Sequence, residues 1–122
     1  MKIVNLSFCE IHILDDDLIE VITNEGIEVN DSMVEEYHEF FRRTFRESFA
    51  VLVNKINSYS YRFSAMLNIG SVKGLKAVAI LHYSKASQES HLVNSIRLKN
   101  KLNMQHFLNR DSAIIWLKGS LK

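Results

Sequence analysis

Hydrophobic and polar residues alternate in two short segments near the start of the chain, which is the pattern of β-strands with one buried face. The alternation covers Ile11-His12-Ile13 in the first segment and Leu18-Ile19-Glu20-Val21 in the second. Three consecutive aspartates, residues 15–17, stand between them, and their mutual repulsion favours a solvated turn. The pattern predicts a β-hairpin with strands over residues 9–14 and 18–23.

A period of 3.6 residues replaces the alternation after residue 31. Ser32 and Glu35 have the spacing of a capping box, in which each side chain satisfies a backbone N–H of the first turn. Glu39 and Arg43 stand four residues apart, as in a helical ion pair. We therefore predict a helix that begins at Ser32. Its buried stripe consists of Val34, Tyr37, Phe41 and Phe45.

The rest of the chain continues as short segments, and the segment over residues 75–82 is almost entirely apolar, as in a strand buried on both faces. We predict strands over residues 49–53, 75–82 and 103–107 and helices over residues 62–69, 87–102 and 111–121, with a polar loop over residues 54–61. The order β-β-α-β-α-β-α-β-α predicts an α/β fold with a largely parallel sheet.

Composition agrees with one globular domain over residues 1–122. Hydrophobic residues make up 47% of the 122 residues and charged residues 24%, which is close to the globular average. No window has the length of uncharged apolar residues that a membrane span needs, and the N-terminus is a poor export signal, so we expect a cytoplasmic protein. A single cysteine, Cys9, excludes an internal disulfide and a cysteine-based metal site.

The net charge of +1 conceals an uneven distribution. Residues 1–61 hold 5 Lys/Arg and 12 Asp/Glu, whereas residues 62–122 hold 10 and 2. The asymmetry indicates either a basic binding surface or two chain halves that attract each other in the fold, and we favour the second interpretation. Arg97, Lys99 and Lys101 form a modest basic patch. We favour a solvated helix face as its interpretation, and contact with an anionic partner is the alternative. No nucleic-acid partner is expected.

Candidate chemistry is sparse. None of the five histidines forms a closely spaced pair, and the three aspartates lack the spacing of a calcium loop, so we expect no metal and no cofactor. His82 remains a candidate functional residue, because it follows the buried strand and open α/β sheets place ligands at the carboxyl ends of strands. No set of nucleophile, base and orienting residue emerges, so the chain is not expected to be an enzyme.

The second half of the chain resembles a known family. The similarity rests on Lys76-Ala77-Val78-Ala79, Asn94, Asn100-Lys101 and the ending Phe107-x5-Ala113-x2-Trp116-Leu117. These residues resemble small, stand-alone, mostly uncharacterised STAS-like proteins of Bacteroidetes; STAS is the domain of sulfate transporters and anti-sigma-factor antagonists. The resemblance implies a four- or five-stranded, largely parallel sheet with four helices in a β/α superhelix.

Anti-sigma-factor antagonists of this family are switched by phosphorylation of a serine at the start of the helix after the third strand. The corresponding stretch here, residues 54–64, lacks the Asp-Ser pair of those proteins. By this resemblance, and because a helix N-terminus favours an anion, the candidate regulatory residues are Ser58, Ser60, Arg62 and Ser64.

These observations predict a non-enzymatic regulatory or binding module that acts through a protein or a small ligand. The alternative is a small-molecule or lipid carrier, since the lipid-binding Sec14 domain has a related fold. A carrier needs an enclosed apolar cavity, whereas a regulatory module has a packed core and an exposed mixed patch. A cavity between the first helix and the sheet would favour the carrier. A homodimer is left open.

Overall fold

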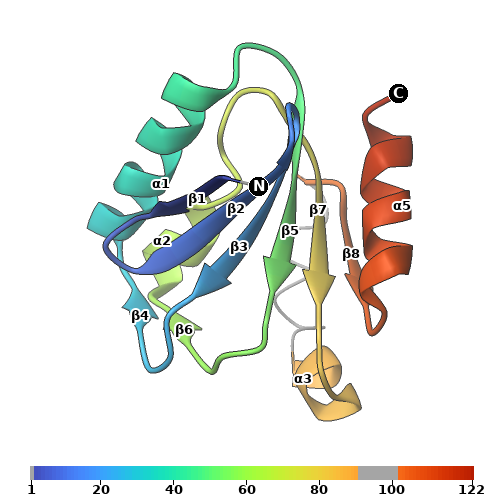
Figure 1. Cartoon of the computed structure of the whole chain (residues 1–122). Helices are drawn as coiled ribbons and strands as arrows, with labels where there is room; N and C mark the ends of the chain where they lie inside the picture. Colours follow the sequence, from blue (N-terminus) through green and yellow to red (C-terminus); the bar gives the residue numbers. More distant parts are fainter. Residues whose placement is uncertain (1, 91–101) are drawn as a thin grey trace.

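A computed structural model of the chain describes residues 2–90 and 102–122 and shows a mixed sheet with helices on both faces (Figure 1). The sheet has six strands in the order β1-β2-β3-β5-β7-β8. β1 to β3 pair antiparallel, and β3, β5, β7 and β8 pair parallel. The strands are β1 (Lys2–Asn5), β2 (Cys9–Asp15), β3 (Leu18–Thr23), β5 (Phe49–Asn54), β7 (Leu75–Leu81) and β8 (Met104–Phe107).

The predicted hairpin and the three predicted later strands are confirmed, but the expected sheet of four or five strands is too small. The additional strand, β1, lies at the edge and pairs with β2 from Lys2↔Ile13 to Asn5↔Glu10. A second, two-stranded sheet joins β4 (Glu28–Val29) to β6 (Ser60–Tyr61). The predicted loop over residues 54–61 therefore ends in a short strand.

The helices in the described ranges are α1 (Asp31–Thr44), α2 (Phe63–Asn68), α3 (Lys85–Ser90) and α5 (Arg110–Ser120). α1 is the predicted first helix, but its cap is Asn30 and not Ser32: the Asn30 Oδ1 accepts the backbone N–H of Met33 at 2.9 Å. α3 (Lys85–Ser90) overlaps the start of the predicted helix over residues 87–102; residues 91–101, which include Arg97, Lys99 and Lys101, lie outside the described residues.

Two hydrophobic clusters lie on opposite faces of the sheet, because successive side chains of a strand point to opposite faces. α1 and α2 cover one face and α5 covers the other (Figure 1). Val51 of the central strand β5 belongs to the cluster under α1, whereas its neighbour Leu52 packs with Ala113 and Leu117 of α5. In the described part of the chain, no helix is long and apolar enough to cross a membrane.

Ion pairs join the acidic first half of the chain to the basic second half. Arg110 at the start of α5 contacts the buried carboxylate of Glu20 on β3, with an Nη2–Oε1 distance of 2.6 Å. The Asn54 amide donates a second hydrogen bond to Glu20, at 2.7 Å. Arg62 lies 3.5 Å from Glu28. These contacts agree with the interpretation that the charge asymmetry draws the two halves together.

Candidate functional site

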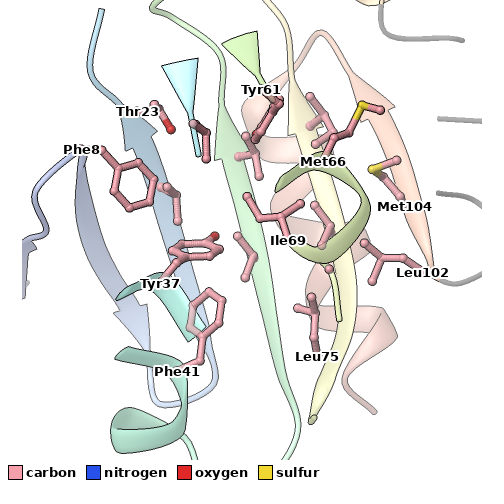
Figure 2. A pocket seen from close by; sticks show the side chains of 17 residues that line it. Phe8, Thr23, Tyr37, Phe41, Tyr61, Met66, Ile69, Leu75, Leu102 and Met104 are labelled. Atoms are coloured by element: carbon pink, nitrogen blue, oxygen red, sulfur yellow. The ribbon is translucent and has the colours of Figure 1, made fainter. Parts of the chain in front are cut away.

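A cavity of about 80 Å³ lies between the helical layer and the sheet, on the face that α1 and α2 cover. Its wall is almost entirely apolar (Figure 2). Side chains from β3, β5, β7 and β8 form the floor, and those of α1, α2 and the segment after α2 form the roof. The lining residues are Phe8, Val21, Thr23, Val29, Tyr37, Phe41, Val51, Val53, Tyr61, Met66, Ile69, Gly70, Leu75, Val78, Ile80, Leu102 and Met104.

The cavity follows from the unequal lengths of the two helices above it. α1 has 14 residues and packs a stripe of aromatic side chains on the sheet, whereas α2 has only six and is fully buried only at Ala65. Past α2 the chain lies close to Leu102, just before β8, since a Cβ on Gly70 would lie 2.9 Å from the Leu102 Cδ2. Branched and unbranched aliphatic side chains thus surround a space that α2 is too short to fill.

Hydroxyl groups gather at one end of this cavity. Figure 2 shows Thr23 and Tyr61 at one end and Phe41 and Leu75 at the other. The hydroxyl of the neighbouring Tyr59 is buried and makes no hydrogen bond of normal geometry within the described residues. Burial raises the pKa of Tyr37, of Tyr59 and of Tyr61 above the usual value of 10.0, so these phenols stay protonated and can donate. The cavity therefore offers hydrogen-bond donors to one end of an apolar ligand.

A second, polar depression lies at the carboxyl ends of β5 and β7, and we call it the groove. Its volume is about 540 Å³, and its lining consists of Lys55, Ile56, Asn57, Ser58, Tyr59, Tyr83, Ser84, Ala86 and Ser87. The Lys55 ammonium lies 4.0 Å from the centre of the Tyr59 ring. Partial burial lowers the pKa of Lys55 to about 8. Among the described residues, the groove thus holds a cation and several hydroxyls, and no carboxylate lines it.

Two histidines and a serine form a chain of hydrogen bonds beside this groove. The Ser87 Oγ lies 2.9 Å from His82 Nδ1, and His82 Nε2 lies 2.8 Å from His106 Nδ1. The register of β7 and β8 fixes the histidines, since the His82 N–H donates to the Phe107 carbonyl at 2.8 Å. Burial, with smaller contributions from His106 and Lys55, lowers the pKa of His82 to about 4. The position of His82 after the buried strand is the one sequence clue to this arrangement; nothing in the sequence indicated its partners Ser87 and His106.

Ser58 and Ser60, two of the predicted regulatory residues, are both exposed. Ser58 lines the groove, and its backbone N–H donates to Glu25 Oε2 at 3.1 Å. Ser60 lies on β6, where it pairs with Glu28 of β4. The structure therefore brings Ser58, but not Ser60, to the edge of the sheet where the groove lies.

The other two predicted regulatory residues lie near carboxylates. Ser64 donates from its Oγ to Asp31 Oδ2 at 3.1 Å, and Arg62, which caps α2, lies against Glu28. A phosphate on Ser64 would meet the negative charge of Asp31, which opposes it. Regulation through these residues stays a prediction, and of the set Ser58 has the most suitable surroundings.

Cys9 is buried on β2, and burial raises the pKa of its thiol to about 12. The thiol is therefore protonated and packs as a small hydrophobic group, as the sequence predicts for a cysteine within a strand. In residues 2–90 and 102–122, no three side chains of histidine, cysteine, aspartate or glutamate gather as ligands for a metal ion.

The low pKa of His82 makes stability depend on pH. Between the ordinary pKa of 6.5 and about 4, the unfolded chain carries a proton on this imidazole and the folded chain does not. The free energy of unfolding should therefore fall as the pH drops through this window, by at most about 1.4 kcal/mol per pH unit from this group. Urea unfolding at pH 7, 6 and 5 should show a steeper loss for the natural protein than for His82→Gln. Equal slopes would contradict a buried, neutral His82.

No family model matches the chain, and no curated protein matches it. Among solved structures, the chain is similar to an uncharacterized protein of the DUF3478 family with a SpoIIAA-like fold, from Shewanella loihica PV-4. The two share 15% sequence identity with a TM-score of 0.60, and the match covers 89% of this chain and 91% of the other. This likeness shows the fold alone: the chain has the SpoIIAA-like, or STAS-like, fold.

Proposed function

We propose that this chain is a STAS-like binding module that holds a small, largely apolar molecule in the cavity between α1, α2 and the sheet. The cavity itself carries the proposal, because a space lined by apolar side chains costs packing energy that an apolar ligand would restore. The Thr23 and Tyr61 hydroxyls at one end suit a single polar group on that ligand. Binding, and not chemistry, is the role that such a wall supports.

The size of the cavity limits the ligand. An engineered apolar cavity of roughly 150 Å³ takes up benzene, and the space here is about 80 Å³. Met66 and Met104 line it, and unbranched methionine side chains can rearrange to admit a longer group. We expect a short aliphatic chain with one hydrogen-bonding end, and not a complete membrane lipid. Of the two readings of the sequence, this favours the carrier over a protein-binding regulator of the anti-sigma-factor-antagonist kind.

Straight-chain primary alcohols from butanol to octanol are suitable probes for the cavity. Each methylene that enters an apolar site contributes about 0.8 kcal/mol, so affinity should rise roughly fourfold per carbon until the chain outgrows the space. Isothermal titration calorimetry measures this dependence directly. Affinity that does not change with chain length would contradict binding in the cavity.

Two substitutions on adjacent residues of β5 provide the matched control. Val51→Phe places a phenyl ring in the cavity and fills part of it, whereas Leu52→Phe places the same ring in the packed cluster on the opposite face. Val51→Phe should abolish alcohol binding with little loss of stability. Leu52→Phe should keep binding but lower the free energy of unfolding by about 1–3 kcal/mol, as overpacking does. If Val51→Phe binds the alcohols as the natural chain does, the proposal is wrong.

A further inference from the structure

The chain of hydrogen bonds from Ser87 through His82 to His106 has the connectivity of a nucleophile, a base and an orienting residue. Its two distances, 2.9 and 2.8 Å, are within the range of direct proton transfer. With the His82 proton on Nε2, that nitrogen donates to His106 and leaves Nδ1 to accept the proton of the Ser87 hydroxyl.

This chain of hydrogen bonds, which we call the relay, ends at the groove, and the groove has room for a substrate. Ser87 lines the groove together with Lys55, whereas His82 is only 1% exposed and lies behind it. The Lys55 ammonium forms no ion pair with a carboxylate of the described residues. Its positive charge acts on His82, as the lowered pKa of that histidine indicates. An unpaired cation beside a nucleophile can stabilise negative charge that develops during reaction.

We propose that Ser87 is a catalytic nucleophile for acyl transfer from small esters bound in the groove, with His82 as general base, His106 as the residue that positions it and Lys55 as the stabiliser of the oxyanion. This activity lies apart from the proposed ligand cavity, because no residue that the structure describes lines both spaces.

The reaction balances without a cofactor. The Ser87 Oγ attacks the ester carbonyl carbon, its proton moves to His82 Nδ1, and the carbonyl electron pair becomes an oxyanion near Lys55. The bond to the leaving alkoxide then breaks, and the alkoxide takes the proton from His82. Water attacks the acyl-serine in the same manner and releases a carboxylic acid, which restores the Ser87 hydroxyl.

The surroundings of His82 predict a slow reaction. Burial and the nearby ammonium oppose a positive charge on this imidazole, so the base becomes effective only when the oxyanion forms beside Lys55 and offsets that charge. His106, as a neutral partner, orients the ring but stabilises the imidazolium less than a carboxylate would. We therefore expect a weak esterase, and the acyl-serine intermediate on Ser87 is the first species to measure.

Hydrolysis of p-nitrophenyl acetate at pH 7.5, with mass spectrometry of the quenched protein, tests the proposal. An acetyl group should appear on Ser87, and Ser87→Ala should lower the rate by about 100-fold or more. Ser60→Ala is the control, because Ser60 is also an exposed serine but lies on β6 and does not line the groove. This control should keep the rate within about twofold.

Further variants test the role of each residue and distinguish a loss of catalysis from a loss of folding. His82→Gln should abolish the acetyl-serine, His106→Gln should slow its formation, and Lys55→Met should lower the acylation rate with folding unchanged by circular dichroism. Val51→Phe, which fills the cavity, should keep full esterase activity, so loss of alcohol binding and loss of this activity are distinguishable. Acetylation confined to lysines, or Ser87→Ala with the rate of the natural chain, would overturn the proposal.

Discussion

Replacement of Phe41 by alanine should lower the free energy of unfolding by about 3–5 kcal/mol, the usual cost of truncating a large buried aromatic residue. Phe41 is 1% exposed and lies at the centre of the aromatic cluster between α1 and the sheet. Its ring centre lies 4.2 Å from that of Tyr37 and 4.8 Å from that of Phe49. Because Phe41 also lines the ligand cavity, its truncation enlarges an existing void, and we expect the upper part of the range.

Chemical denaturation of the natural chain and of Phe41→Ala measures this difference, with Ile115→Ala as the control. Ile115 is also a hydrophobic residue of a helix, but it is 72% exposed on α5, so its removal should change the free energy by less than about 0.5 kcal/mol. Equal effects of the two substitutions would mean that α1 does not pack on the sheet through Phe41.

The elements that were predictable from the sequence are those that bury a complete face. The stripe through Tyr37 and Phe41 predicts α1, and the apolar run that ends at Leu81 predicts β7, because each pattern reflects burial over several turns or residues. The helix cap was misplaced because Ser32 and Glu35 imitate a capping box inside the first turn, while Asn30 makes the hydrogen bond.

Strands that depend on a distant partner were not predictable. β1 has one neighbouring strand, and most of its residues are exposed, so the segment over residues 2–5 carries no alternating pattern. β4 and β6 have two residues each and exist only because they pair with each other, with paired residues 32 positions apart in the sequence. Tertiary pairing, and not local propensity, determines such strands.

The candidate sites were less predictable than the fold, for two physical reasons. The cavity is lined by the same apolar residue types that fill a packed core, and whether space remains depends on how closely α2 approaches the sheet. The relay joins His82 to His106, 24 residues later in the sequence, through the pairing of β7 with β8. Trp116 of α5 is half-buried against Phe107, so its truncation should lower the free energy of unfolding less than that of Phe41.

Gly74→Ala should also be strongly destabilising, by about 2–4 kcal/mol, because backbone strain and a steric clash add at this position. Gly74 has a φ of +93°, which residues with a side chain rarely adopt. A Cβ would lie 2.8 Å from the Glu47 carbonyl oxygen, a backbone atom that cannot turn away. The Gly74 carbonyl also accepts the Phe49 N–H at 2.9 Å, so any shift disturbs the start of β5.

Gly119→Ala is the control, and we expect it to raise the free energy of unfolding instead of lowering it. Gly119 lies in α5, and a Cβ there would meet no atom within 4 Å, so alanine should stabilise the helix by about 0.5–1 kcal/mol. Thermal unfolding should therefore show a lower midpoint for Gly74→Ala and a higher one for Gly119→Ala. If Gly74→Ala and the natural chain have the same unfolding midpoint, the turn before β7 does not have the left-handed conformation. The close approach of residues 47 and 74, which aligns β5 with β7, would then also be wrong.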